Sequence, residues 1–171
     1  MPAINNCRSC KSKKLKKLFN LGEQNYTGIF YKNKSQKVPK GKLELIMCKK
    51  CYLVQLSENF NLKMMYGKTY GYRTGLNASM VKHIKNKVNY LSNILKSNKT
   101  KNMTVIDIGS NDGTLLNFFF QKKKLNLIGV DPTASKFRSF YKKEIKVISN
   151  FFTYQKVKKY LKNRKADIVT S

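Results

Sequence analysis

The stretch Val105-Ile106-Asp107-Ile108-Gly109-Ser110-Asn111-Asp112-Gly113 decides the fold of the second half of the chain. An apolar run that leads into a glycine turn predicts a buried strand followed by a tight turn. Apolar residues recur from Thr114 to Gln121, so the turn should open a helix. In an open parallel sheet, ligands bind at this place, outside the carboxyl ends of the strands. The stretch therefore predicts a fold and the position of a ligand site.

Strands and helices alternate after this stretch. The patterns predict strands at 125–130, 145–148 and 166–170, with helices starting near 135–141 and at 154–162. Such alternation indicates a parallel sheet with helical crossovers. Before the stretch, an apolar stripe predicts a helix from Asn77, its cap, to about Leu95. We therefore predict an α/β chain whose residues 103–171 form the first half of a Rossmann-like parallel sheet, ending after its fourth strand.

The glycine turn differs from that of a dinucleotide site. Asn111 stands where the middle glycine would be, and the last glycine, Gly113, comes two residues later. Asn tolerates positive φ, so the tight turn can still form. S-adenosylmethionine has no phosphate, so a turn with fewer glycines is enough for it. Asp131 ends the next strand, where a carboxylate can accept two hydrogen bonds from a ribose diol; a purely structural role is the alternative.

Candidate cofactor-binding residues lie at or just after the ends of the first three predicted strands of the second half. They are Asp107, Gly109, Ser110, Asn111, Asp112, Gly113, Asp131, Pro132, Asn150 and Phe151. Asn150 can meet the amino edge of adenine, and Phe151 can pack on the ring. The alternative is a strand end whose Phe151–Phe152 pair fills the core, and both interpretations stay open.

The four cysteines form two matched pairs, Cys7-x-x-Cys10 and Cys48-x-x-Cys51. Zinc needs about four ligands in a tetrahedron, and each pair supplies two thiolates from one tight turn. We therefore predict a structural zinc site, closed to catalysis, within a small subdomain; redox thiols are the alternative. Apolar residues at 43–47 and 52–56 predict a hairpin with the second cysteine pair at its tip.

The charge of +28 would be typical of a protein that binds nucleic acid. However, only four of the 36 basic residues are Arg, and the lysines are spread along the whole chain. Solvated surface lysine explains this pattern better than a nucleic-acid site, and help in attracting an anionic substrate is the alternative. No apolar run is long enough to span a bilayer, and the N-terminus lacks the apolar core of a signal peptide. We expect a cytoplasmic monomer with reduced thiols and no membrane association.

We divide the chain into a zinc-binding module at 1–75, a linker helix at 76–102 and a partial cofactor-binding domain at 103–171. Residues 60–75 are rich in Gly and Tyr and predict a loop. Within it, Tyr70, Tyr72 and Arg73 are candidate contacts of the active site; the alternative for the tyrosines is to anchor the loop by packing. His83, one residue from the stripe position Ile84, is expected on the surface of the linker helix or in packing, and a functional role is the alternative.

With these residues in view, the chain resembles the sugar C-methyltransferase family. The resemblance covers nearly all of the chain and rests on the cysteine pairs and on four further stretches. These are Leu21-Gly22-Glu23-Gln24, Tyr52-Leu53-Val54-Gln55-Leu56, Tyr70-Gly71-Tyr72-Arg73-Thr74-Gly75-Leu76-Asn77 and Ile108-Gly109-Ser110-Asn111-Asp112-Gly113-Thr114-Leu115-Leu116.

The resemblance implies an S-adenosylmethionine-dependent enzyme that methylates carbon on a nucleotide-linked keto-deoxysugar. A base removes the proton beside the ketone, and the enolate attacks the methyl group. By the resemblance, Asp107 and the turn Gly109–Gly113 shape the methionine pocket, Asp131 holds the ribose, and Tyr72 lies on a loop that approaches the active site.

The chain departs from the family by ending at the fourth strand. The resemblance therefore implies an N-terminal fragment whose general base is expected beyond Ser171, and it leaves the catalytic residues of this chain unknown. Two other hypotheses remain. One is a zinc-ribbon module that binds nucleic acid, and the other is a truncated pseudoenzyme that binds cofactor without doing chemistry.

Overall fold

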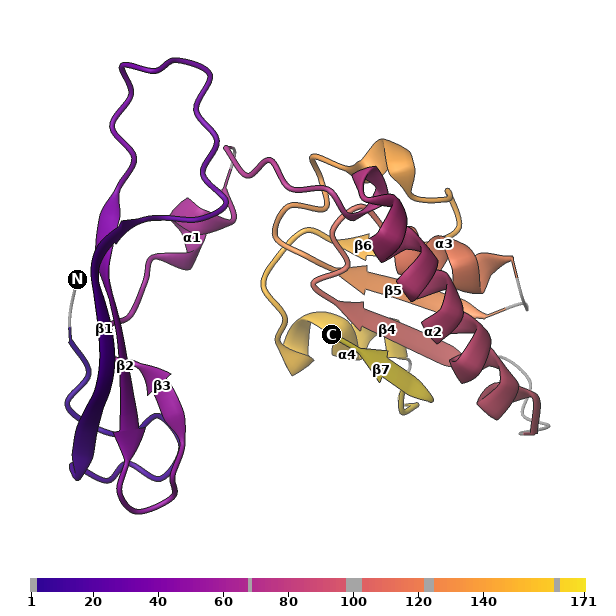
Figure 1. Ribbon diagram of the computed structural model, residues 1–171. Helices are drawn as coiled ribbons and strands as arrows, with labels where there is room; N and C mark the ends of the chain where they lie inside the picture. The colour runs from indigo at the N-terminus through magenta and orange to yellow at the C-terminus, as the bar shows by residue number, and fades with distance from the viewer. Residues whose placement is uncertain (1–2, 68, 98–102, 122–124, 162–163) are drawn as a thin grey trace. The chain divides into compact units, whose positions relative to one another are not determined.

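The computed structural model describes residues 3–67, 69–97, 103–121, 125–161 and 164–171. Contacts divide the chain into two compact units, Met1–Gly71 and Tyr72–Ser171. The first unit holds an antiparallel sheet and the second a parallel sheet with helices (Figure 1). The predicted α/β class, with a four-cysteine module before a Rossmann-like sheet, is confirmed.

The first unit is a three-stranded sheet in the order β1-β2-β3. Its strands are β1 (Leu15–Asn25), β2 (Lys40–Cys48) and β3 (Val54–Leu56). Strands β2 and β3 form the predicted hairpin, with Leu45 opposite Leu56, and the second cysteine pair lies at its turn. Strand β1 pairs with β2 through two irregularities in register, and Gly22 takes a positive φ of 74° within the second.

Burial in the first unit follows the two-residue period of a strand only in β2. There the side chains of Glu44, Ile46 and Cys48 are buried on one face, while all of β1 after Leu15 is exposed. Lys42 and Lys17 form ion pairs with Glu44, at 2.9 and 3.7 Å. The short helix α1 (Leu62–Met65), capped by Asn61, falls where a loop was expected.

The second unit is a four-stranded parallel sheet in the order β6-β5-β4-β7. Its elements are the 3-10 helix η1 (Thr74–Leu76), α2 (Ala78–Ser97), β4 (Thr104–Ile108), α3 (Thr114–Phe120), β5 (Asn126–Val130), the 3-10 helix η2 (Arg138–Phe140), β6 (Lys146–Ile148), α4 (Tyr154–Leu161) and β7 (Ile168–Thr170). Helix α2 starts at the predicted cap, because Asn77 Oδ1 accepts a hydrogen bond from the Met80 N–H at 3.1 Å.

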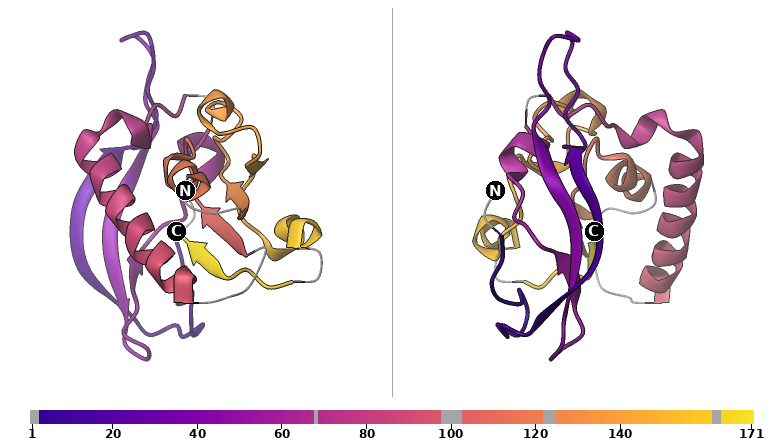
Figure 2. Two further views of the ribbon diagram at one scale, coloured as in Figure 1. Left: turned by 90° about the vertical axis from the view of Figure 1, so that its right-hand side faces the viewer. Right: turned by 60° about the vertical axis from the view of Figure 1, so that its left-hand side comes forward.

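Both faces of this sheet are covered, which explains the nearly continuous apolar runs of its strands. Val105 and Leu127 pack with Val88 of α2 and Phe119 of α3 in one core cluster. Their neighbours on the other face pack against α4 in a second cluster, with members Ile106, Ile128, Val130, Val157 and Leu161. The left view of Figure 2 shows the sheet between α2 and α4.

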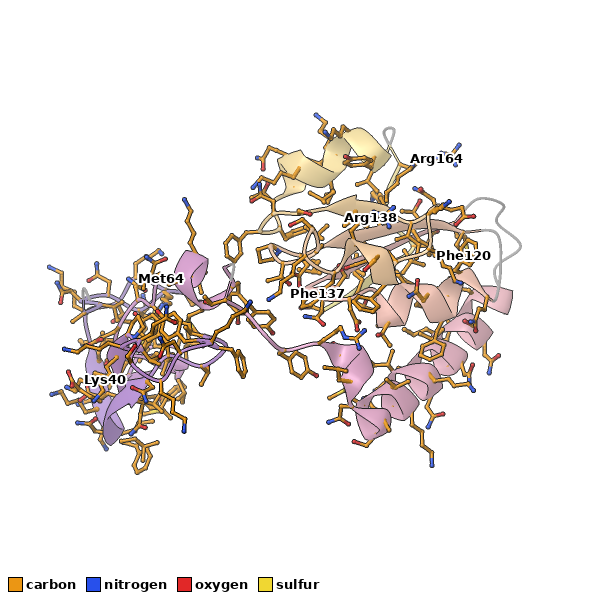
Figure 3. All side chains as sticks on the ribbon, turned by 90° about the horizontal axis from the view of Figure 1, so that it is seen from above. Lys40, Met64, Phe120, Phe137, Arg138 and Arg164 are labelled. Carbon is orange, nitrogen blue, oxygen red and sulfur yellow. The ribbon has the colours of Figure 1, made fainter. Side chains whose placement is uncertain are left out.

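The predicted helix at 135–141 is wrong. The segment forms turns and the three-residue helix η2, and Tyr141 then takes an extended backbone conformation. The Asn117 side chain explains this ending, because it donates to Phe140 O at 2.8 Å and accepts from Lys142 N at 3.1 Å. These bonds satisfy backbone groups that a longer helix would have used. Figure 3 labels Phe137 and Arg138 in this connection.

Within the described residues, no helix has the length and the apolar character that crossing a membrane requires.

Candidate metal centre and cofactor pocket

The two cysteine pairs adopt matching turns. In each, the residue after the second cysteine has a positive φ, 60° at Lys11 and 59° at Tyr52. Its N–H donates to the carbonyl of the first cysteine, at 3.0 Å for Lys11 to Cys7 and 2.9 Å for Tyr52 to Cys48. Each turn therefore directs two sulfurs to one side.

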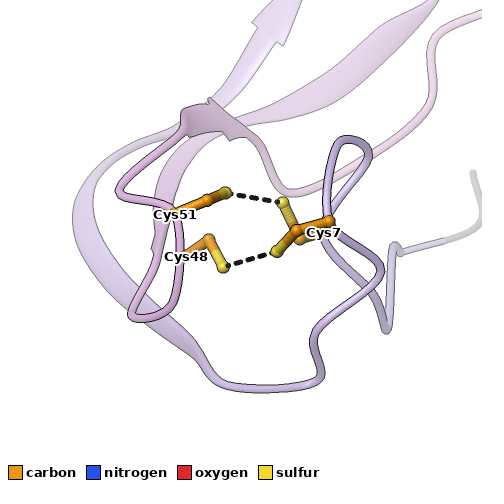
Figure 4. A group of neighbouring side chains, drawn as sticks. Cys7, Cys48 and Cys51 are labelled. Carbon is orange, nitrogen blue, oxygen red and sulfur yellow. Dashed lines mark hydrogen bonds between the residues drawn. The ribbon is translucent and has the colours of Figure 1, made fainter.

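The four sulfurs converge on one point (Figure 4). The Cys7 and Cys51 Sγ atoms lie 3.6 Å apart, those of Cys10 and Cys48 lie 3.5 Å apart, and all four lie within 4.8 Å of one another. Tetrahedral zinc with Zn–S bonds of ~2.3 Å needs sulfurs about 3.8 Å apart. The spacing is too long for disulfides, whose S–S bond is about 2.05 Å. The residues therefore fit a structural zinc ion.

The pKa values of the thiols also favour a bound cation. The backbone N–H of Cys10 is the main cause that lowers the pKa of Cys7 to about 6, and the N–H of Cys51 likewise lowers the pKa of Cys48. The N–H of Leu53 favours the Cys51 thiolate, but the Cys10 sulfur and burial outweigh it and raise the pKa of Cys51 to about 11. A divalent ion would remove the repulsion among the thiolates.

Arg8, inside the first cysteine pair, ties that turn to the rest of the unit. Its guanidinium donates to the Leu56 carbonyl at 2.6 Å and to the Glu58 carbonyl at 2.9 Å, and its backbone N–H donates to Gln55 Oε1 at 3.1 Å. Arg8 could not be singled out from the sequence, because a lone arginine between two ligands has no recognisable pattern.

The glycine turn after β4 takes the conformation that its residues favour. Gly109, Asn111 and Gly113 have φ values of 75°, 47° and 75°, so Asn111 does adopt the positive φ expected of it. A side chain on Gly113 would meet the Tyr141 ring at 2.5 Å. Tyr141 in turn donates from its hydroxyl to Asn111 O at 2.7 Å and lies 2.9 Å from Ser110 Oγ. Burial raises the pKa of Tyr141, which keeps it neutral.

Asn111 and Asp112 hold the chain just before α2. Asn111 Oδ1 accepts from Thr74 N at 2.9 Å, and its amide donates to Tyr72 O at 3.2 Å. Asp112 Oδ2 accepts from Gly75 N at 2.8 Å. Both side chains are buried in this role, which the sequence did not reveal because the contacts span nearly forty residues.

Asp131 is buried at the end of β5. Its carboxylate accepts from Asn111 N at 3.0 Å and from the N–H and hydroxyl of Thr133 at 2.6 and 2.5 Å. Asp131 thus holds the glycine turn against the next strand, and binding of a ribose there stays a prediction. Pro132 follows it, half-buried.

The other predicted site residues are more exposed to solvent than Asp131. Asn150 is exposed and its Oδ1 accepts from the Phe151 N–H, while Phe151 is half-buried and Phe152 exposed. Arg73 lies over the Phe140 ring, 3.9 Å from its centroid, and Tyr72 is exposed. Tyr70 belongs to the first unit, where its ring lies 5.5 Å from that of Tyr66.

A cavity of about 450 Å³ lies at the carboxyl end of β4, within the second unit. Three of the candidate cofactor residues line it: Asp107, Gly109 and Ser110. Helix α2 contributes His83, Ile84, Lys87 and Leu91, and Thr74, Thr114, Leu115 and Thr170 complete most of the wall. The volume suits a small organic ligand. His83 is exposed on α2, as expected of a helix-surface residue, and it also lines the cavity, which the sequence did not reveal.

Asp107 is the acidic group of this cavity. Its side chain is 7% exposed, and the Thr170 hydroxyl donates to Oδ1 at 2.7 Å. Burial raises the pKa of Asp107 to about 6, and the nearby Asp131 charge adds to this effect. A positive ligand group beside it would restore the ionised form.

Residues 7–66, which include all four cysteines, match the methyltransferase-family model described as a "Putative zinc binding domain". The match covers about a third of the chain and lies within the first unit. Comparison with curated proteins gave no match. The chain therefore carries a zinc-binding domain of a kind found in methyltransferases, beside a Rossmann-like sheet.

Proposed function

We propose that the second unit binds S-adenosylmethionine and that the chain is part of an S-adenosylmethionine-dependent methyltransferase. The observation that carries the proposal is the cavity at the carboxyl end of β4, beside a glycine turn that opens a helix. Ligands of open parallel sheets bind at this edge. The match of the first unit to a methyltransferase domain is independent support.

The turn suits a cofactor without a phosphate. Asn111 and Asp112 use their side chains to hold residues 72–75, and Gly113 is needed for the close approach of Tyr141. The backbone N–H groups of Asn111 and Gly113 already donate to Asp131 Oδ2 and to Ser110 O, so they are not free for a pyrophosphate. The cavity beside them combines apolar side chains with Asp107, which fits a small zwitterionic ligand better than a dinucleotide.

We further propose that the substrate is a nucleotide-linked keto-deoxysugar, methylated on carbon through an enolate. The resemblance described above is the support for this substrate. It assigns the general base to a region that follows the four strands of this chain. We therefore expect the chain to bind cofactor and do not assign the base to any of its residues.

Calorimetric titration of the chain with S-adenosylhomocysteine tests the cofactor proposal. We expect binding by the parent chain and its loss in Asp131→Ala, with zinc content unchanged. Asp167→Ala is the matched control, because Asp167 accepts from Thr104 N at the opposite end of the strands. Absence of binding by the parent chain, or equal binding by Asp131→Ala, would overturn the proposal.

A further inference from the structure

The two cysteine pairs come from different parts of the first unit. The second pair lies at the turn between β2 and β3, whereas the first precedes β1. Gln55, in the middle of β3, connects the two parts, because its Oε1 accepts from the Arg8 backbone N–H at 3.1 Å and from the Arg8 guanidinium at 3.3 Å. Gln55 is opposite Ile46 in the sheet and is 8% exposed. Its side chain therefore lies in the interior of the unit, close to the first cysteine pair.

The two bonds from Arg8 determine which way the Gln55 amide faces. Both Arg8 groups are donors, so the oxygen must face Arg8 and the NH2 group must point to the other side of the amide. Nε2 is buried, and it donates to no oxygen or nitrogen of the residues that the structure describes. A buried donor without an acceptor is costly, so this group needs an explanation.

The sulfur of Cys7 can accept from this donor. Cys7 is fully buried and directly precedes Arg8. The Gln55 side chain is one of the hydrogen-bonding groups that lower the pKa of Cys7, after the backbone N–H of Cys10, which is the main cause. A thiolate that ligates a metal keeps lone pairs for such donors, and donors outside the ligand set fix the orientation of the ligands.

We propose that Gln55 is a positioning residue of the metal site, whose Nε2 donates to the Cys7 sulfur in the metal-bound state while its Oε1 holds Arg8. One side chain of β3 thus positions a ligand of the first pair against the hairpin that carries the second. The N–H···S bond withdraws charge from the thiolate, which reduces the repulsion among four thiolates on one cation. The inference goes beyond the proposed function, since it concerns the first unit and needs no S-adenosylmethionine.

Gln55→Glu separates the role of the donor from that of the acceptor. The variant keeps an oxygen for Arg8, with a stronger bond to the guanidinium, but it replaces the donor beside the Cys7 thiolate by a second oxygen. Competition between the full chain and a chelator should show zinc binding weakened about 10–100-fold. Gln36→Glu, in the exposed loop between β1 and β2, makes the same change of charge and should leave the affinity unchanged.

Gln55→Met removes the donor and the acceptor with an unbranched side chain of similar size, and it should weaken zinc binding about tenfold. Cobalt in place of zinc then serves as a spectroscopic probe. The thiolate-to-cobalt charge-transfer band should move to lower energy in Gln55→Met and in Gln55→Glu, because loss of the N–H···S bond raises the electron density on the sulfur. A role limited to packing or to holding Arg8 would not move this band.

Four results would overturn the inference. An affinity and a cobalt band like those of the parent in Gln55→Glu would show that Gln55 only holds Arg8. A weakened affinity with an unmoved band would assign Gln55 to packing, and complete loss of metal by both variants would assign it to folding of the unit. A parent chain that binds no zinc would overturn the metal site together with this inference. Titration with S-adenosylhomocysteine decides the proposed function separately in every case.

Discussion

The two units of the chain are stabilised in different ways. In the first, the buried hydrophobic residues among those described are Cys7, Tyr26, Ile46 and Cys48, and two of these are metal ligands. The second has apolar clusters on both faces of its sheet. A small sheet with one strand almost wholly exposed cannot bury enough surface to be stable alone. We therefore expect the first fold to depend on metal coordination and the second on apolar burial.

Removal of zinc should have the largest effect and should act on one unit only. Structural zinc contributes roughly 10–16 kcal/mol of apparent binding free energy, which exceeds the stability of a small domain. Chelation, or Cys48→Ser, should therefore unfold the first unit while the second keeps its cooperative melting. Amide NMR spectra would show this as loss of dispersion confined to residues 3–67. Ser9→Ala, in the same turn as Cys7 but without a ligand, is the control. Preserved dispersion after chelation would contradict the comparison.

Truncation in the second unit should have the converse effect. Phe119 is fully buried in the cluster below α2, whereas its neighbour Phe120 is 38% exposed. Phe119→Ala should cost ~3–5 kcal/mol, and Phe120→Ala about 1 kcal/mol or less. Denaturant unfolding with zinc present measures both. Zinc stoichiometry should stay the same in both variants, and its loss in Phe119→Ala would show that the units are not independent.

The sequence predicted the second unit well because burial on both faces leaves a strong signal. The strands β4 and β5 and the helices α2, α3 and α4 lie close to their predicted positions. The helix expected at 135–141 was wrong because the side chain of Asn117, far away in sequence, bonds to the backbone that would have extended it. Such long-range contacts have no periodic pattern.

The four-cysteine cluster was easier to predict from the sequence than the cavity of the second unit. The two Cys-x-x-Cys pairs are a recognisable pattern of metal ligands, and in the structure the four sulfurs converge. The pocket depends on which face of α2 meets the carboxyl end of β4. His83 and Lys87 therefore could not be recognised from spacing alone, whereas Asp107, Gly109 and Ser110 could. Asn111 and Asp112 were predicted to contact a ligand because they lie in the glycine turn. In the structure their side chains instead bind the backbone of residues 72–75.

A smaller effect is expected at Asp107, where the second unit buries a carboxyl group at a cost. The folded state raises its pKa from the ordinary 3.8 to about 6, so the folded protein binds the proton more tightly than the unfolded chain. This contribution to stability is present below about pH 4 and is lost as the pH rises through about 6. Asp107→Asn should therefore be more stable than the parent at pH 7, by at most ~3 kcal/mol, and equal to it near pH 4. Equal stability of the variant and the parent at both pH values would contradict the raised pKa. Asp167→Asn, at an exposed position, is the control.

The smallest effect concerns positive φ in the cysteine turns. Glycine takes positive φ in both units, for example at Gly22 and Gly109, whereas the two cysteine turns place Lys11 and Tyr52 there, at 60° and 59°. A side chain in this conformation costs roughly 1–2 kcal/mol, which a substitution to glycine would remove. The greater freedom of glycine in the unfolded chain offsets part of the stability gained in this way. The Tyr52 side chain is 71% exposed, so its removal sacrifices little packing.

Tyr52→Gly should therefore stabilise the zinc-bound first unit by about 0.5–1 kcal/mol. Competition with a chelator measures this as a modest rise in apparent zinc affinity. Lys49→Gly, in the same turn but without a positive φ, should lower that affinity instead, because glycine there only adds freedom to the unfolded chain. Opposite signs at positions 49 and 52 would show that backbone strain, and not side-chain bulk, limits the turn. Equal signs would mean that zinc coordination outweighs the backbone preference, which would make the dependence of this unit on its metal stronger still.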